Sequence, residues 1–239
     1  MIALETQELT MNFGGVKALK AIDFKMKKNE LRCLIGPNGA GKSTFFKIIS
    51  GQQSPTSGKV YFNEQDITHL EAFERARLGI GIKNQIPSVM DGLSVYENLM
   101  LASQRQIGSD SPAKKIAAIC SLLELSHLFD KQVGELAHGQ RQWVEIGMML
   151  VNEPELILFD EPAAGMSDEE TREMAKIILK LTEKASVIVV EHDIRFLRLI
   201  AEKVTVFNQG EILFEGTFDE VVQNEEVRRV YLGRGTDKC

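Results

Sequence analysis

The sequence predicts an α/β fold, and three observations support that prediction. Apolar, strand-like runs alternate with amphipathic helical segments near both ends of the chain, a pattern typical of a parallel sheet covered by helices. A glycine-rich loop at residues 36–43 lies between such a run and a helical segment. The middle of the chain has helical periodicity, so we expect a helical insertion at about 86–153.

Composition and charge exclude several classes of protein for this chain. The chain has 239 residues, 44% of them hydrophobic and 26% charged, which fits one globular domain with room for an inserted subdomain. Its 28 Lys and Arg against 34 Asp and Glu give a net charge of −6, which argues against non-specific nucleic-acid binding. No apolar run approaches the roughly 20 residues that span a membrane, and the first residues lack a signal-peptide pattern. We therefore expect a soluble, cytoplasmic protein with reduced cysteines.

The first third of the chain is expected to be rich in strands. Residues 2–26 alternate polar and apolar stretches and break at Gly14-Gly15, which predicts strands joined by a turn. The mostly apolar run 31–35 predicts a buried strand, and residues 45–50 predict a helix after the glycine-rich loop. Residues 55–68 combine turn residues with a short β-like run.

The remaining chain returns to strand–helix alternation after a helical stretch. Helical periodicity is found at 95–106, 114–124 and 140–151. Strands are predicted at 156–159 and 187–190, with an amphipathic helix at 168–183 between them. We expect a single domain, 1–239, whose α/β core comprises about 1–85 and 154–239 and whose helical subdomain comprises about 86–153.

The glycine-rich loop fits a phosphate-binding motif. Residues 36–43 read Gly-Pro-Asn-Gly-Ala-Gly-Lys-Ser, which matches G-x-x-x-x-G-K-[ST] between a strand and a helix. The glycines let backbone N–H groups point into one concavity, and the helix N-terminus adds its positive dipole end. Lys42 would reach the β- and γ-phosphates, and Ser43 would place its hydroxyl on Mg²⁺. The motif predicts nucleoside triphosphate binding but leaves kinases, GTPases and ATPases open.

Two neighbouring acids follow the predicted strand at 156–159. Asp160 and Glu161 precede Pro162, which helps to end the strand. An acid at the carboxyl end of a parallel strand faces the ligand crevice of an α/β sheet. Asp160 would hold Mg²⁺ through its water shell, and Glu161 would polarise the attacking water. The alternative is a solvated acidic turn.

Together these motifs resemble the nucleotide-binding subunit of an ATP-binding-cassette (ABC) transporter, over nearly the whole chain. The matching segments, in order, are Phe13 as the adenine-stacking aromatic residue, 36–44 as Walker A, Gln85 as the Q-loop glutamine, 136–140 as the signature, 156–161 as Walker B, 163–167 as the D-loop and His192 as the switch histidine. The resemblance implies a P-loop NTPase (RecA-like) core, an N-terminal antiparallel β subdomain and an inserted α-helical subdomain that carries the signature.

The resemblance also implies a residue set for ATP and Mg²⁺. ATP would be held by Phe13, Gly36, Pro37, Asn38, Gly39, Ala40, Gly41, Lys42, Ser43 and Thr44, and across a dimer interface by Ala137, His138, Gly139 and Gln140. The metal ligands would be Ser43, Gln85 and Asp160. Hydrolysis would use Glu161, His192 and Gln85, with His192 donating a hydrogen bond to the γ-phosphate. Because Gln85 starts the helical insertion, nucleotide state could move that insertion.

Partners follow from the same resemblance. Two cassettes would pair head to tail with ATP at the interface, either as a homodimer or with a second, unlike ABC ATPase subunit. The pair would drive integral-membrane permease subunits, served indirectly by a solute-binding protein, from the cytoplasmic face of the inner (plasma) membrane. No nucleic acid is expected. Segments 86–90 and 93–99 are apolar enough to receive a permease helix, although they could equally pack within the subdomain.

Three residues depart from the common family pattern. Ala137 and His138 stand where the signature usually has Ser and Gly, so the hydroxyl that contacts the γ-phosphate is missing. His138 or backbone N–H groups could replace that contact, and we expect hydrolysis to survive. Ser167 stands where the D-loop usually has Asp, but 167–170 also reads as a helix capping box.

The segments 13–15, 36–39, 77–80 and 161–166 resemble the uptake group for branched-chain amino acids. Segments 138–143 and 145–148, with the ending 231–234, look most like its urea-type members. Solute choice resides in other subunits of such systems, so branched-chain amino acids, urea and short amides all stay open. An exporter ATPase, for example for lipids, and a non-transport ABC ATPase are the alternatives. A phosphoryl-transferring kinase is disfavoured by the signature and Glu161.

Overall fold

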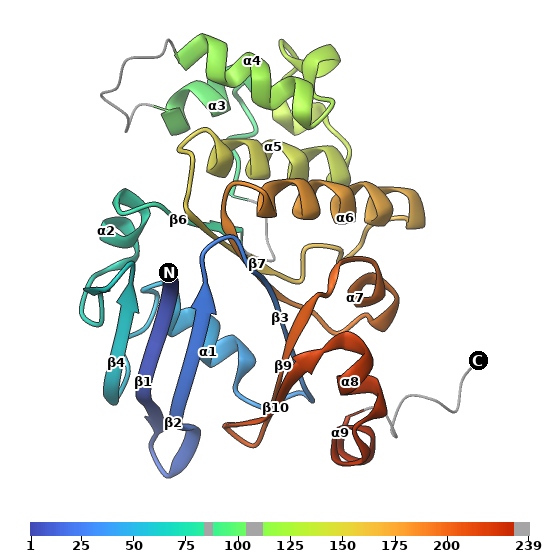
Figure 1. The fold of residues 1–239 in the computed structure, drawn as a ribbon. Helices are drawn as coiled ribbons and strands as arrows, with labels where there is room; N and C mark the ends of the chain where they lie inside the picture. The colour runs from blue at the N-terminus through green and yellow to red at the C-terminus, as the bar shows by residue number, and fades with distance from the viewer. Residues whose placement is uncertain (84–87, 104–111, 232–239) are drawn as a thin grey trace.

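The computed structural model describes residues 1–83, 88–103 and 112–231. The chain forms two sheets, with helix α1 (Lys42–Ile49) between them and most other helices on the far side of the larger sheet (Figure 1). None of the helices within these described ranges is long and apolar enough to cross a membrane.

The smaller sheet is antiparallel and has the strand order β2-β1-β4-β5. Its strands are β1 (Ile2–Phe13), β2 (Val16–Lys27), β4 (Ser57–Phe62) and β5 (Gln65–Asp66). The turn between β1 and β2 passes through Gly14, whose φ of +56° suits glycine. The strands predicted within 2–26, with their turn at Gly14-Gly15, are thus confirmed, as is the N-terminal antiparallel sheet.

The larger sheet has the order β10-β9-β3-β8-β7-β6, and all neighbours except β10 and β9 are parallel. Its strands are β3 (Leu31–Ile35), β6 (Ile80–Lys83), β7 (Leu156–Asp160), β8 (Ser186–Val190), β9 (Lys203–Asn208) and β10 (Glu211–Thr217). Every residue of β3 and β8 is buried, which explains why their sequences are mostly apolar. The predicted strands at 31–35, 156–159 and 187–190 are confirmed.

Helices α3, α4 and α5 gather at one end of the molecule, beyond α6 (Figure 1). The remaining helices are α2 (Ala72–Arg77), α3 (Val95–Ser103), α4 (Pro112–Leu122), α5 (His138–Leu150), α6 (Asp168–Thr182), α7 (Ile194–Ile200), α8 (Phe218–Gln223) and α9 (Glu225–Val230), with 3-10 turns at Ser126–Leu128 and Val133–Glu135. The predicted helices are found, except that residues 104–106 of the helix predicted at 95–106 lie outside the described residues. Helix α1 begins three residues earlier than predicted, directly after the glycine-rich loop. The subdomain limits near 86 and 153 stay a prediction.

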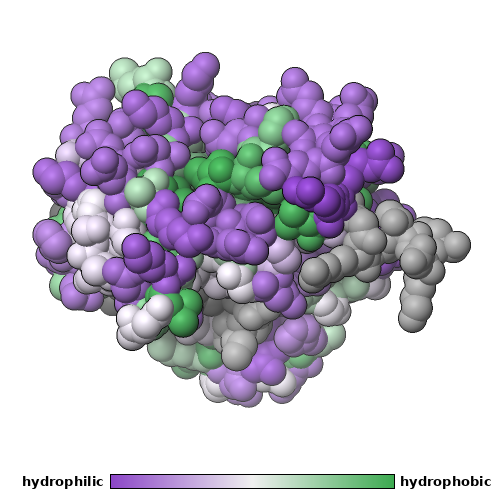
Figure 2. Space-filling model, turned by 90° about the horizontal axis from the view of Figure 1, so that it is seen from below, coloured by the Kyte–Doolittle hydropathy of each residue, from purple (hydrophilic) through white to green (hydrophobic). Residues whose placement is uncertain are grey.

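Two apolar cores lie on opposite faces of the larger sheet. Leu31, Cys33 and Ile35 of β3 pack toward α3–α7, whereas Leu34 packs toward α1 and the smaller sheet. This alternation follows from the two-residue period of a strand. The molecule seen from below in Figure 2 is mostly hydrophilic, with apolar side chains exposed in the middle of that face.

Arg75 fixes the C-terminal end of α1 from a neighbouring helix. Its guanidinium is buried and donates to the carbonyls of Ile48 (2.6 Å), Ile49 (3.0 Å), Thr68 (3.1 Å) and Leu70 (2.9 Å). Burial lowers its pKa to about 10, so it stays charged at neutral pH. A cation at this position satisfies the last carbonyls of α1 and complements the negative end of its dipole.

Arg75→Met should lower the free energy of unfolding by about 3 kcal/mol, because buried carbonyls at the end of α1 lose a charged donor. Urea unfolding measures this loss. The matched control is Arg77→Met, an exposed arginine of the same helix, which should change stability by less than about 0.5 kcal/mol. Equal losses in both variants would contradict this role for Arg75.

Candidate nucleotide-binding site

The loop between β3 and α1 is shaped by glycines. Gly36, Gly39 and Gly41 have φ values of +143°, +79° and +108°. A Cβ atom at Gly36 would lie 2.1 Å from the carbonyl oxygen of Phe207, and one at Gly41 would lie 2.8 Å from that of Ala18. Gly41 also gives α1 no side-chain cap. The loop therefore passes close to two other strands and leaves the N-terminus of α1 ready for an anion.

Lys42 folds back over this loop. Its Nζ donates hydrogen bonds to the carbonyls of Gly36 (2.6 Å) and Pro37 (3.1 Å). Burial lowers the pKa of Lys42, while the nearby Glu161 and Asp160 act in the opposite direction. The ammonium group thus lies in the field of both acids, so the structure brings these three predicted site residues together.

Asp160 is the last residue of β7, in register with Val190 of β8, and Glu161 follows it in a turn. Asp160 is partly buried, and burial followed by the charge of Glu161 raises its pKa. Glu161 has a φ of +49° and donates its backbone N–H to the carbonyl of Val190 (2.9 Å). Two successive residues of a regular strand would point to opposite faces. Because the backbone turns at Glu161, its side chain need not point to the face opposite Asp160.

His192 lies beside Glu161. Its Nδ1 is 3.1 Å from Oε1 of Glu161, and the imidazole is largely exposed. His192 follows β8, which lies between β3 and β7 in the sheet. The loop at 36–43, His192 and the two acids therefore follow three adjacent parallel strands and meet at their carboxyl edge, where α/β sheets bind ligands.

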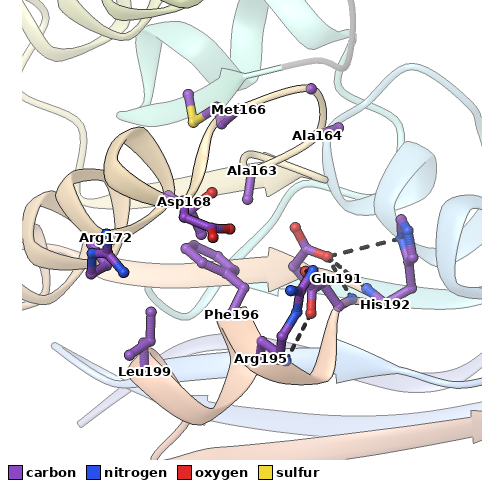
Figure 3. Close-up of a pocket in the computed structure, with 13 residues that line it drawn as sticks. Ala163, Ala164, Met166, Asp168, Arg172, Glu191, His192, Arg195, Phe196 and Leu199 are labelled. Atoms are coloured by element: carbon purple, nitrogen blue, oxygen red, sulfur yellow. Dashed lines mark hydrogen bonds and ion pairs between the residues drawn. The ribbon is translucent and has the colours of Figure 1, made fainter. Parts of the chain in front are cut away.

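Glu191 is a buried residue of this edge that sequence reasoning missed. Its Oε2 accepts hydrogen bonds from the backbone N–H groups of His192 (2.7 Å) and Asp193 (3.0 Å), and burial raises its pKa. The Tyr231 hydroxyl donates to the carbonyl of His192 at 3.4 Å. Figure 3 shows Glu191 in the turn before α7, and its hydrogen bonds fix the part of this turn that carries His192. The sequence signal that could have identified Glu191 was an acid directly after the all-apolar run 187–190.

A pocket of about 480 Å³ opens beside this turn (Figure 3). Ala163 and Met166 line one wall, and His192 and Phe196 line the other. The segment 163–167 that follows Glu161 thus has an open side next to His192. Ala164 and Gly165 in this segment are exposed, so the pocket side of the segment is accessible from solvent.

The predicted signature residues form the start of α5 and contact the segment after Glu161. Ala137 donates its backbone N–H to Gln140 Oε1 (3.1 Å), and His138 Nε2 lies 3.0 Å from Gln142 Nε2. Gln142 Nε2 also donates to the carbonyl of Ala164 at 3.4 Å. A Cβ at Gly139 would lie 2.1 Å from Glu170 Oε1. Gly139 and Gln142 thus join the first turns of α5 to residues 164–170, which include the end of the D-loop segment and the start of α6.

Ser167 is a helix cap, as its spacing predicted. Its hydroxyl accepts from the backbone N–H of Glu170 (3.3 Å), and Glu170 accepts from the backbone N–H of Ser167 (2.9 Å), which completes a capping box for α6.

Two further predicted site residues, Phe13 and Gln85, make none of the contacts described above. Phe13 ends β1 with 47% of its surface exposed, as a base-stacking ring requires. Gln85 lies outside the described residues, as do residues 86 and 87 of the predicted docking segment.

Comparison with known families identifies the chain. Residues 19–164 match the family described as ABC transporter. The chain belongs to the ABC transporter family. Residues 211–237 also match a family described as branched-chain amino acid ATP-binding cassette transporter. The resemblance predicted from the motifs is confirmed.

Relatives and solved structures align over nearly the whole cassette. This chain is 31% identical to the high-affinity branched-chain amino acid transport ATP-binding protein BraF of Pseudomonas aeruginosa, over 96% of this chain and 97% of that protein. It is 32% identical to LivG of Salmonella typhimurium, over the same shares of each chain. The ADP conformation of MJ1267, an ATP-binding cassette of an ABC transporter, superposes with a TM-score of 0.86 at 31% identity, covering 98% of this chain and 99% of that one. The dimeric structure of MJ0796, a bacterial ABC transporter cassette, has a TM-score of 0.79 at 27% identity, covering 90% and 98%.

These findings confirm the predicted fold class and enzymatic class. The cassette binds and hydrolyses ATP and is an energy-coupling subunit of an ABC transporter. The exporter and non-transport alternatives are not favoured, since the relatives are transport ATPases of the branched-chain amino acid group.

Replacing Gly36 by Ala should cost about 3 kcal/mol or more of folding free energy, because the new Cβ meets the backbone of Phe207 and the residue keeps a positive φ. Gly39→Ala is the matched control. It also has a positive φ, but an added Cβ meets nothing within 4 Å, so about 1 kcal/mol of strain is expected. Urea unfolding of both variants measures the difference, and equal losses would refute the close approach at Gly36.

Proposed function

We propose that ATP binds at the carboxyl edge of the larger sheet and is hydrolysed by residues of that edge. The loop 36–44 would hold the phosphates through its backbone N–H groups and Lys42, and Phe13 would stack on adenine. The observation that carries this proposal is the convergence of Lys42, Asp160, Glu161 and His192 at the ends of three adjacent strands.

The same edge fits a magnesium ion. Mg²⁺ prefers oxygen ligands and usually combines one or two carboxylates with phosphate oxygens and water. Asp160 supplies a carboxylate whose negative charge is disfavoured by burial and by Glu161, so a cation there would relieve both effects. Ser43 would add a hydroxyl from the first turn of α1, and Gln85 is proposed as a third ligand. When bound, Mg²⁺ would offset charge on the phosphates.

Glu161 and His192 are proposed to act on the water and the γ-phosphate. A carboxylate beside the imidazole at 3.1 Å can orient a water and accept its proton while His192 donates a hydrogen bond to a phosphate oxygen. Glu191 holds the backbone of His192 in place for this contact.

The signature residues Ala137, His138, Gly139 and Gln140 are proposed to complete the site of a second cassette. They form the N-terminus of α5, whose dipole favours a phosphate. The contacts of Gly139, and of Gln142 in the next turn of α5, with the segment 163–170 would connect one site of the dimer to the other. The partner is a second copy or an unlike ABC ATPase.

We propose uptake of a small polar solute, with branched-chain amino acids favoured by the names of the relatives and by the match at 211–237. Urea and short amides are the other solutes that the sequence suggests. Integral-membrane permease subunits and a solute-binding protein would select the solute. The cassette would lie peripherally at the cytoplasmic face of the plasma membrane.

The docking surface for the permease is proposed near Met90, which has 53% of its surface exposed. Asn98 is buried and holds this loop, accepting from the backbone N–H of Met90 (2.8 Å) and donating to its carbonyl (3.0 Å). Tyr96 instead packs against Phe129, with ring centroids 4.7 Å apart. Met90 is therefore the better probe of docking within the proposed helical subdomain.

Glu161→Gln should trap an ATP-bound dimer, because the amide cannot accept the proton of the attacking water while the phosphate contacts are retained. Light scattering after size exclusion, at saturating ATP and Mg²⁺, measures the mass. Glu183→Gln, at an exposed acid on the C-terminal end of α6, is the matched control and should behave like the unmodified chain. A Glu161→Gln protein that stays monomeric would count against the proposal.

Ala137→Ser should leave the ATPase rate within about threefold of the original. Ala137 is the exposed N-cap residue of α5, so Ser adds a helix cap worth about 1 kcal/mol and restores the usual signature hydroxyl. Steady-state hydrolysis and thermal unfolding measure the two effects. A tenfold loss of rate would mean that the Ala137–His138 pair does work that the common signature cannot do.

A further inference from the structure

The imidazole of His138, at the start of α5, has one ring nitrogen held by the protein and the other open. His138 Nε2 lies 3.0 Å from Nε2 of Gln142, which follows one turn later in the helix. His138 is exposed, whereas only 2% of Gln142 is exposed. Nδ1 of His138 makes no hydrogen bond with any residue in the described ranges. The contact with Gln142 therefore decides whether Nδ1 can donate or accept.

The partners of Gln142 assign the proton on this ring. A carbonyl oxygen only accepts hydrogen bonds, so the Gln142 atom 3.4 Å from the carbonyl of Ala164 is the amide nitrogen. Turning the amide round would bring two oxygens together. The amide nitrogen donates and does not accept, so the acceptor in its contact with His138 is Nε2. A neutral imidazole whose Nε2 accepts has its proton on Nδ1.

Glu170 is the acid near this ring, and its oxygens are engaged elsewhere. Hydrogen bonds from Ser167 and then the charge of His138 lower the pKa of Glu170. Its Oε2 accepts from the backbone N–H and the hydroxyl of Ser167, both at 2.9 Å. Its Oε1 lies against Gly139. Among the described residues, no hydrogen bond joins Glu170 to His138, so Nδ1–H is open to an acceptor from outside the chain.

The segment that carries His138 lacks a donor that the common signature has. Ala137 is the N-cap residue of α5 and has no hydroxyl, whereas the usual signature has Ser at this position and Gly at the next. The N-terminus of a helix favours a phosphate, and a side-chain donor there adds a directed hydrogen bond. The two departures from the common pattern therefore compensate each other, because one removes an O–H donor and the other supplies an N–H donor.

We propose that His138 Nδ1–H donates to the γ-phosphate held by the opposite cassette, in place of the signature hydroxyl, and that Gln142 is the positioning residue that keeps the proton on Nδ1. This inference rests on the proposed function, in which the signature segment completes the site of a second cassette. The opposite tautomer would present a lone pair to the phosphate and repel it. Gln142 thus acts on the contact without touching the nucleotide, and its bond to Ala164 holds it in place.

The tautomer can be measured on the full chain without nucleotide. Nitrogen-15 NMR of histidine-labelled protein at about pH 9, where free histidine is neutral, distinguishes the two tautomers. The chain has four histidines, so the His138→Gly spectrum identifies the His138 signals. We expect the Nδ1–H form at His138, and Gln142→Leu should lower its share. An Nε2–H ring in the unmodified chain, or an unchanged share in Gln142→Leu, would overturn the inference.

The phosphate contact is tested by dimerisation of the Glu161→Gln chain at saturating ATP and Mg²⁺, measured by analytical ultracentrifugation. His138→Gly in this background should weaken dimerisation about tenfold or more, because a hydrogen bond to a charged group is lost at each of two sites. Adding Ala137→Ser recreates the usual Ser-Gly pair and should restore most of the affinity. His127→Gly is the matched control, since this exposed histidine belongs to none of the motifs and should leave the affinity unchanged.

The outcomes separate this inference from the proposed function. A Glu161→Gln chain that stays monomeric would count against the proposed dimer itself. A dimer of unchanged affinity in His138→Gly would overturn only the role of His138, as would Nδ1–H donation to Glu170, which gives the expected tautomer without an effect on dimerisation. A loss in His138→Gly that Ala137→Ser does not restore would also overturn it, because a purely structural role at the start of α5 predicts that result.

Discussion

The attraction between the partly buried ammonium of Lys42 and the acids Asp160 and Glu161 is the constraint on which the site depends. It needs the ends of β3 and β7 to lie close together, with only β8 between them, and the sheet order provides this. His192, which follows β8, is thereby placed next to Glu161. The glycines of the loop make room for β2 and β9, so the loop can sit at the same edge. Arg75 holds the other end of α1. A site for a polyphosphate follows from this strand order and from the charges of Lys42, Asp160 and Glu161 that it brings to one edge.

Two sets of contacts tie this edge to α5. At the start of the helix, Gly139 approaches Glu170 and Gln142 reaches Ala164, in the segment that follows Glu161. In the middle of the helix, Glu145 pairs with Lys83 beside the end of β7. The helix that carries the signature is therefore held at two points near Asp160 and Glu161. Helix α5 belongs to the region proposed to face the membrane subunits.

Local sequence patterns predicted the strands and the chemistry that follows them. The G-x-x-x-x-G-K-S spacing located the loop, the apolar run before Asp160 located β7, and Ser167 with Glu170 predicted a cap that the structure contains.

Contacts between distant segments could not be predicted this way. The Glu161–His192 contact needs the β7–β8 neighbourhood, and the Lys83–Glu145 pair joins residues far apart in sequence, with no spacing rule that relates them. Glu191 was missed because its role depends on burial, which the sequence suggests only weakly. The edge strand β10 pairs antiparallel, which alternation of strands and helices does not foresee.

The measurement that tests the central claim most directly is purification of the tagged chain from gently solubilised membranes of its native cells, with mass spectrometry of what accompanies it. An energy-coupling ATPase of an uptake system should carry many-helix permease subunits and a second cassette, with a solute-binding protein recovered when its solute is present. ATP hydrolysis by that complex should rise when the binding protein and solute are added. Recovery of soluble partners only, or of a cassette fully active by itself, would contradict the claim.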